Sequence, residues 1–249
     1  MKGLDLIIIR KPNIAMAEAY RTLRTNIQFS SFDEKIKTLL VTSPGLGEGK
    51  TTTASNLAIV MAQGGSKTLL IDCDQRNPNI HRVFGLSNAE GLSNILVDKN
   101  EVDKNETDEN RIDINRCIQK TEITNLHILS SGTRPPNPAE LLGSTKMKNF
   151  TEELKGIYDF IILDTPPIIL VTDAQILAQY ADGCLLVISS GETERDLVIK
   201  AKRLLEKVNA KILGVVINKL DLKKSSYYHY QYEYGDNSKG KSSRKKSEK

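Results

Sequence analysis

The stretch SPGLGEGKTT, residues 43–52, has the residue types of a phosphate-binding loop. Its three glycines allow the backbone to curl until successive N–H groups point inward, and the helix expected after it adds the positive end of its dipole. Lys50 is placed to reach the terminal phosphates of a nucleotide, and the Thr51 hydroxyl to bind Mg²⁺. The residues expected to bind the nucleotide are Gly45, Gly47, Glu48, Gly49, Lys50, Thr51 and Thr52. The strict pattern has glycine where this chain has Pro44, but the order of strand, glycine loop and helix still indicates phosphate binding.

Three carboxylates are expected at the same end of the molecule. The apolar run in LLIDCDQRNP leads into Asp72 and Asp74, and the run in FIILDTPP leads into Asp164. Residues two apart on a strand share a face, and ligands of open α/β sheets bind at the carboxyl ends of the strands. Buried carboxylates beside a triphosphate are costly unless Mg²⁺ and Lys50 balance their charge. The alternative is that they serve as helix caps or turn residues.

Short apolar runs alternate with helical patterns along the chain. The runs that predict strands are residues 36–43, 66–73, 125–131, 158–164, 182–189 and 210–218, and the stretches that predict helices are 14–29, 51–63, 145–155, 173–180 and 193–208. Continuous apolar runs are typical of parallel strands that are buried on both faces. The pattern therefore predicts an α/β fold of the P-loop NTPase type, with a mostly parallel sheet and helices on both faces.

The motifs SPGLGEGKTT, LLIDCDQRNP and FIILDTPP resemble the Walker A, Walker A′ and Walker B motifs of bacterial tyrosine kinases of the capsule and exopolysaccharide type. GTRPPNPAELL (132–142) also resembles a stretch typical of that family. The resemblance covers the chain from about Ile14 to the tyrosines near its C-terminus. Related ATPases that partition DNA or position division sites carry a lysine where this chain has Gly45, and they lack a terminal tyrosine cluster. A P-loop enzyme acting on a small molecule is a third interpretation.

The resemblance implies a role for each motif residue. Lys50 stabilises charge on the phosphoryl group that is transferred, Thr51 binds Mg²⁺, and Asp74 and Asp164 hold the ion. Asp72 takes the proton of the attacking tyrosine, although the roles of Asp72 and Asp74 could be exchanged. Arg76 resembles the basic residue that closes Walker A′, and Asn218 is a candidate contact of adenine. ATP and Mg²⁺ are the cofactors implied.

Tyrosines are concentrated in SSYYHYQYEYG, residues 225–235, which we call the tyrosine cluster: Tyr227, Tyr228, Tyr230, Tyr232 and Tyr234. The alternation is also the period of a strand, so an edge strand is a second interpretation, and an adhesive aromatic patch is a third. The ten residues from Asn218 to Tyr228 span at most roughly 33–36 Å, which keeps the cluster near the phosphate site. The resemblance implies that these tyrosines are phosphorylated, and favours a neighbouring subunit's site over the chain's own.

A helical stretch near the N-terminus, EAYRTLR, places Glu18, Arg21 and Arg24 along one face. By itself this pattern is typical of a solvated helix with an ion pair. In the family a similar helix packs against the next subunit of a ring, so the resemblance implies a homo-oligomer. It also implies a separate transmembrane adaptor that activates the kinase, and protein substrates with tyrosine.

The bulk properties set the remaining bounds. No apolar run approaches the roughly 18 residues of a membrane span, and three widely spaced cysteines favour a reduced setting; we expect a cytoplasmic protein recruited to the inner face of the membrane by its adaptor. Residues 235–249 hold six basic and two acidic residues, hence +4, which is the formal charge of the whole chain. The remaining, neutral part argues against nucleic-acid binding.

We therefore divide the chain into three parts. Residues 1–35 form an N-terminal segment with the oligomerisation helix, and 36–222 form the P-loop kinase domain. Residues 223–249 hold the tyrosine cluster and a basic tail without apolar residues, which is expected to be disordered. Within the domain, residues 97–110 contain a tandem VDKNE and almost no apolar side chain, which predicts a solvated surface loop.

Overall fold

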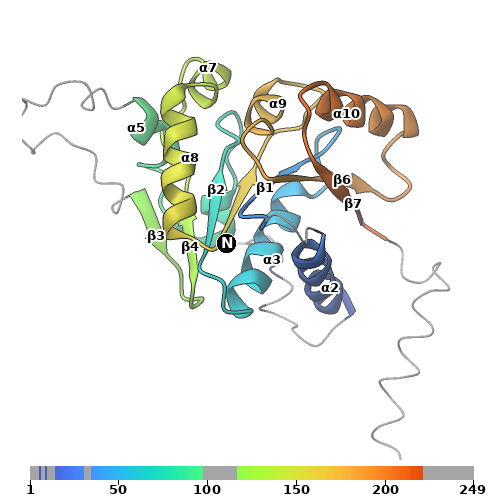
Figure 1. Ribbon diagram of the computed structural model, residues 1–249, viewed down its shortest axis with the longest axis horizontal. Helices are drawn as coiled ribbons and strands as arrows, with labels where there is room; N and C mark the ends of the chain where they lie inside the picture. The colour runs from blue at the N-terminus through green and yellow to red at the C-terminus, as the bar shows by residue number, and fades with distance from the viewer. Residues whose placement is uncertain (1–5, 7–8, 10–14, 31–34, 98–116, 221–249) are drawn as a thin grey trace, which may run out of the picture.

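The computed structural model describes residues 6, 9, 15–30, 35–97 and 117–220, and within them seven strands form one sheet in the order β3-β4-β2-β5-β1-β6-β7 (Figure 1). The strands are β1 (Thr38–Thr42), β2 (Thr68–Asp72), β3 (Ile118–Lys120), β4 (Leu126–Leu129), β5 (Phe160–Asp164), β6 (Gly183–Ser189) and β7 (Ile212–Asn218). All neighbours are parallel except β3, which is antiparallel to β4. The mostly parallel sheet that the sequence predicts is confirmed.

Helices cover both faces of this sheet (Figure 1). They are α2 (Ala15–Phe29), α3 (Lys50–Gln63), α4 (Ile80–Phe84), α5 (Leu92–Val97), α7 (Pro138–Leu142), α8 (Thr145–Ile157), α9 (Asp173–Leu177) and α10 (Arg195–Lys207). Side chains of α2, α3 and α4 pack on one face, and those of α5, α8, α9 and α10 on the other. In the part of the chain that the structure describes, no helix is long and apolar enough to cross a membrane.

The two faces of β1 show why the strand sequences are continuously apolar. Leu39 and Val41 belong to the hydrophobic core under α2 and α3, whereas Leu40 belongs to the core under α8 and α9. All three side chains are fully buried. Burial of such a side chain is worth roughly 1.5–3 kcal/mol, so each residue of a central strand contributes to one core or the other.

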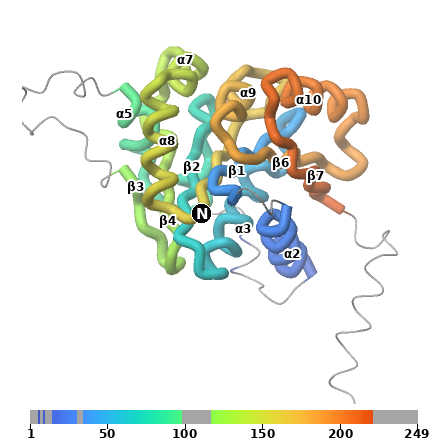
Figure 2. The backbone as a smooth tube through the Cα atoms, viewed as in Figure 1, coloured from blue at the N-terminus to red at the C-terminus, as the bar shows by residue number. Residues whose placement is uncertain are grey.

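Helix α2 lies against α3 on the outside of the sheet, as the backbone tube shows (Figure 2). Ala17 and Ile27 of α2 are buried in the core that α3 also joins. Arg24 donates from Nη1 to the backbone carbonyl of Val60 at 2.9 Å. Because α2 covers it, α3 has buried residues on most of its surface and no polar face comparable to that of α10.

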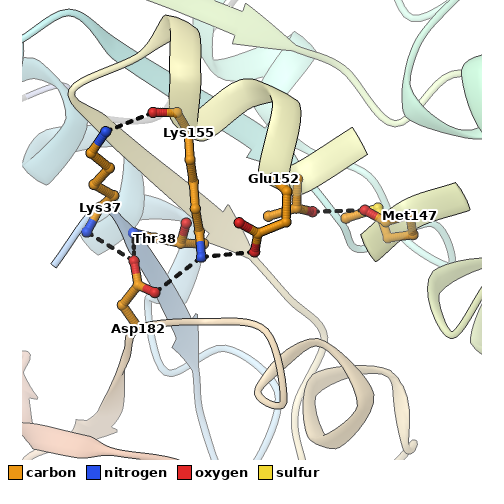
Figure 3. A network of polar contacts seen from close by, with 7 residues as sticks. Lys37, Thr38, Met147, Glu152, Lys155 and Asp182 are labelled. Atoms are coloured by element: carbon orange, nitrogen blue, oxygen red, sulfur yellow. Dashed lines mark hydrogen bonds and ion pairs between the residues drawn. The ribbon is translucent and has the colours of Figure 1, made fainter. Parts of the chain in front are cut away.

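A polar network fixes the amino end of β1, at the opposite end of the strand from the glycine loop (Figure 3). One carboxylate oxygen of Asp182 accepts the backbone N–H groups of Lys37 and Thr38 at 2.9 and 2.8 Å. The other oxygen lies 3.1 Å from Lys155 Nζ, which also contacts Glu152. These bonds tie the start of β1 to α8 and to the residue before β6.

The segments predicted as strands and the longer segments predicted as helices are confirmed to within a few residues. The sequence did not predict β3 or the short helices α4, α5 and α7. The segment 97–110 lies outside the described residues except for Val97, so its interpretation as a surface loop stays a prediction.

Candidate active site

The glycine loop joins β1 to α3 as the sequence predicts, and Lys50 is the first residue of that helix. Gly47 and Gly49 have φ values of 72° and 90°, the left-handed region that glycine adopts without strain. The Lys50 side chain is buried, with 8% of its surface exposed. Thr51 and Thr52 follow in the first turn of α3 and are half-buried. The loop thus has the curled form and the following helix that a phosphate group requires.

Asp72 and Asp164 end two adjacent strands, and they are register partners in the pairing of β2 with β5. Asp72 is fully buried and Asp164 is 1% exposed. Since β5 also pairs with β1, both carboxylates lie at the carboxyl ends of the strands, where the glycine loop begins. This is the convergence of strand ends that the sequence predicts.

Backbone amides hold the Asp72 carboxylate in place. Its Oδ2 accepts the N–H groups of Asn79 and Ile80, both at 2.9 Å, and its Oδ1 accepts that of Asp74 at 3.2 Å. Asp72 therefore shapes the turn after β2 as well as facing Asp164. Asp74 is half-buried, and its Oδ1 accepts the N–H of Asn77 at 2.9 Å. Of the two aspartates, Asp74 is the more accessible to a ligand.

Burial changes the acidity of both carboxylates. Burial, together with the charge of Asp164, raises the pKa of Asp72 to about 8. Burial raises the pKa of Asp164 to about 7, against the opposing effects of the Lys50 charge and a hydrogen bond from Thr51. Two ionised carboxylates in this position require a cation.

The same residues fit a bound Mg²⁺. Asp164 Oδ1 is buried and has no hydrogen-bond partner among the described residues. Carboxylate and hydroxyl oxygens are the ligands that Mg²⁺ prefers, and the ion usually keeps several waters. Asp164, Thr51 and the half-buried Asp74 could therefore hold the ion beside the phosphates, as the sequence predicts.

Sequence reasoning missed two polar residues of the site, Asp173 and Thr193, although it singled out the residue that each of them contacts. Arg76 donates from Nε and Nη2 to both carboxylate oxygens of Asp173, each at 3.0 Å, and Asp173 is fully buried at the start of α9. The hydrogen bonds to Asp173 raise the pKa of Arg76. This pair ties the Walker A′ turn to α9.

Thr193, which contacts Glu48, was the other residue that sequence reasoning missed. Neither Asp173 nor Thr193 lies in a recognisable motif.

Asn218 lies at the glycine loop, where its Nδ2 donates to the carbonyl of Glu48 at 3.1 Å. Its contact with adenine stays a prediction.

Replacement of Gly49 by alanine is expected to weaken nucleotide binding by at least about tenfold. The left-handed backbone costs a side chain about 1–2 kcal/mol, and about 1.4 kcal/mol is tenfold in affinity. A Cβ at Gly49 would in addition lie 1.9 Å from Asn218 Nδ2, so the asparagine must move. Titration calorimetry with Mg·ATP measures the effect. Gly156→Ala is the matched control, because a Cβ at this helical glycine meets nothing within 4 Å beyond the backbone of its own helix. The affinity of this variant for ATP should equal that of the wild type.

The three residues expected in an oligomer interface differ in their surroundings. Arg21 pairs with Glu18 at 2.7 Å on the exposed side of α2. Arg24 instead bonds to α3 of its own chain, and its Nη1 would lie 2.5 Å from a Cβ at Gly64. The tyrosine cluster lies outside the described residues. The last described strand of the chain is β7, which is an edge strand of the sheet (Figure 2).

Comparisons with known proteins agree with this geometry. The profile of a family described as an AAA domain matches residues 37–214, which defines the chain as a P-loop protein of that class. The chain is 45% identical over 226 residues to the tyrosine-protein kinase YwqD of Bacillus subtilis, covering 91% of this chain and 90% of the relative. It is 39% identical over 214 residues to the tyrosine-protein kinase CpsD of Streptococcus agalactiae, covering 86% and 87%. The chain belongs to the family of bacterial tyrosine-protein kinases.

Solved structures show the same relationship. The chimerical protein CapA2B2 matches with a TM-score of 0.79 and 39% identity, over 86% of this chain and 89% of that one. The kinase domain of the Escherichia coli tyrosine kinase ETK matches with a TM-score of 0.77 and 30% identity, over 90% and 85%. The septum site-determining protein MinD of Pyrococcus horikoshii, complexed with Mg-ADP, shares the fold with a TM-score of 0.59 and 24% identity over 74% and 71%. The partition-type interpretation is thus less supported than the kinase one.

Proposed function

We propose that this protein transfers the γ-phosphoryl group of ATP to tyrosine hydroxyls, first those of its own tyrosine cluster, and so regulates the synthesis of a capsular or extracellular polysaccharide. The observation that carries the proposal is the meeting of Asp72 and Asp164 at adjacent strand ends beside the glycine loop and Lys50. Membership of the tyrosine-protein kinase family supports the choice of acceptor.

In the proposed reaction the phenolic oxygen forms a bond to the γ-phosphorus as the bond to the bridging oxygen of ADP breaks. The glycine loop holds the β- and γ-phosphates through its amides, and Lys50 stabilises the charge that develops on the transferred group. The phenolic proton passes to one carboxylate of the pair Asp72 and Asp74. Thr51, Asp74 and Asp164 would hold Mg²⁺, which would neutralise negative charge on the phosphates.

Membership of the family supports a proposal for the partners. We infer a homo-oligomer in which the tyrosine cluster of one copy reaches the site of another, and a transmembrane adaptor that recruits the protein to the inner face of the membrane and activates it. The Glu18–Arg21 pair lies on the exposed side of α2, where a second copy could reach it.

Replacement of Arg21 and Arg24 by alanine is expected to shift the oligomer towards monomers and to slow phosphorylation between copies. The structure predicts different effects for the two substitutions. Arg21→Ala should shift the assembly without loss of stability, whereas Arg24→Ala should also cost about 1 kcal/mol of unfolding free energy, because the bond to the Val60 carbonyl is lost. Light scattering and urea unfolding measure the two effects.

The control is Lys202→Ala, which removes an exposed i,i+4 ion pair with Glu206 on α10. It should alter neither assembly nor stability appreciably. If the double variant forms an assembly of unchanged size, Glu18 and Arg21 lie on a solvated helix face and not in an interface.

The function itself is tested by incubation of the pure protein with labelled Mg·ATP and the cytosolic segment of an adaptor, followed by mass spectrometry of residues 221–249. The proposal expects phosphate on the tyrosine cluster. ATP hydrolysis without any phosphotyrosine would instead favour the partition-type ATPase.

A further inference from the structure

Glu48 is a carboxylate inside the glycine loop, and it is almost buried, with 7% of its surface exposed. Its Oε2 accepts the backbone N–H of Gly45 at 3.2 Å, which closes the loop upon itself. Its Oε1 accepts a hydrogen bond from Thr193 Oγ1 at 2.8 Å. A buried charge with few partners is unstable, so the bond from Thr193 is part of what keeps this carboxylate in its place.

Thr193 is itself oriented by the backbone. It lies in the segment between β6 and α10, and its hydroxyl oxygen accepts the N–H of Ser189 at 2.8 Å. Because the oxygen already accepts this bond, the hydroxyl proton is directed to Glu48. Thr193 thus connects the carboxyl end of β6 with a loop that lies 145 residues earlier in the chain.

Asn218 supports the same residue from the end of β7. Its Nδ2 donates to the Glu48 carbonyl at 3.1 Å, and its Oδ1 accepts the N–H of Lys219 at 2.9 Å. The Asn218 carbonyl accepts the N–H of Ser190 at 2.9 Å, which joins the end of β7 to the segment that carries Thr193. The side-chain and backbone groups of Glu48 are therefore both held from one side of the loop.

We propose that Thr193 and Asn218 are positioning residues for nucleotide binding, which act through Glu48 to hold the glycine loop in its phosphate-binding form. A loop with glycine at positions 45, 47 and 49 has large conformational freedom, and freezing it during binding would reduce affinity. Amides that are fixed in advance avoid this loss. The inference rests on the proposed binding of ATP and adds the residues that prepare the site for it.

The test is the dissociation constant of Mg·ATP for the full chain, measured by titration calorimetry. Thr193→Val should raise it roughly tenfold, equivalent to about 1.4 kcal/mol. Thr193→Ser keeps the hydroxyl and should stay within about twofold of the wild type. In protein that already carries Glu48→Ala, Thr193→Val should have little further effect, because the residue through which it acts is gone. Once ATP saturates the site, the phosphorylation rate of Thr193→Val should approach that of the wild type.

The matched control is Thr151→Val. Thr151 is fully buried, whereas Thr193 is half-buried, and the Thr151 hydroxyl donates to the Met147 carbonyl at 2.9 Å within α8. The Thr151→Val variant should be less stable than the wild type and should bind ATP with the same affinity. Equal affinities of Thr193→Val and wild type, or equal losses in Thr193→Val and Thr193→Ser, would overturn the proposal. If the Thr193→Val variant does not fold, Thr193→Ala, which also lacks the hydroxyl, must show the same weakening. Absence of ATP binding by the wild type would instead refute the proposed function.

Discussion

Lys50→Met is expected to lower tyrosine phosphorylation by at least about 10²–10³-fold while the protein stays folded. Removal of one group that stabilises developing charge in a water-poor site has an effect of this size. Lys50 is buried at the start of α3, where the glycine loop ends. Methionine has a similar length and an apolar stem, so the packing of that stem is retained. Phosphotyrosine formed by the pure protein with labelled Mg·ATP is the measurement, with circular dichroism as the test of folding.

Lys67→Met is the matched control for this change. Lys67 lies at the amino end of β2, at the opposite end of the strand from Asp72, and its Nζ is 5.0 Å from the ring centre of Tyr158. Its loss should cost about 0.5–1 kcal/mol of stability and leave phosphorylation intact. If pure Lys50→Met protein still forms phosphotyrosine at the wild-type rate, the glycine loop is not the phosphoryl-transfer site.

The sheet was predictable because most of its strands are buried on both faces. A strand such as β5, FIILD, is apolar at every position before its terminal aspartate, and all five residues are buried. β3 has only three residues, IQK, at the edge of the sheet and in partial contact with solvent. Such a strand carries no pattern of its own, and its antiparallel pairing with β4 is set by the folded structure.

The carboxylates of the site were predictable for a related reason. Asp72 and Asp164 each follow an apolar run, and parallel strands deliver their last residues to one edge. Asp173 and Thr193 could not be found in this way. Their roles depend on how α9 and the segment before α10 pack against the loops, and this packing brings Asp173 to Arg76, 97 residues away in the sequence. Contacts of this kind do not produce a recognisable pattern of residue spacing in the sequence.

Conversion of all five tyrosines of the cluster to phenylalanine is expected to remove most of the phosphotyrosine and to prevent dissociation of the oligomer upon addition of ATP. The change removes the acceptor hydroxyls but leaves the site untouched, so the affinity for Mg·ATP should equal that of the wild type. The reason for the effect on assembly is electrostatic. Each phosphotyrosine adds a charge of about −1.5 to −2, and five add roughly −8 to −10.

This added charge exceeds the +4 of residues 235–249. A cluster that enters a neighbour's site as neutral phenols would leave it as a polyanion, facing Asp72, Asp74 and Asp164 across a short distance. Like charges in such a site repel, so the phosphorylated segment should no longer dock there. The wild-type oligomer should accordingly loosen as phosphorylation proceeds.

Light scattering before and after addition of Mg·ATP distinguishes the possibilities when it is combined with mass spectrometry of the tail. Tyr180→Phe is the control for tyrosine loss elsewhere, since the Tyr180 hydroxyl donates to the Leu142 carbonyl at 2.8 Å and serves the fold. It should keep both phosphorylation and ATP-dependent dissociation. A wild type that stays assembled when fully phosphorylated would refute the switch but not the kinase. A phenylalanine variant with as much phosphotyrosine as the wild type would show that the acceptors lie elsewhere, and the alternation of tyrosines would then indicate an edge strand.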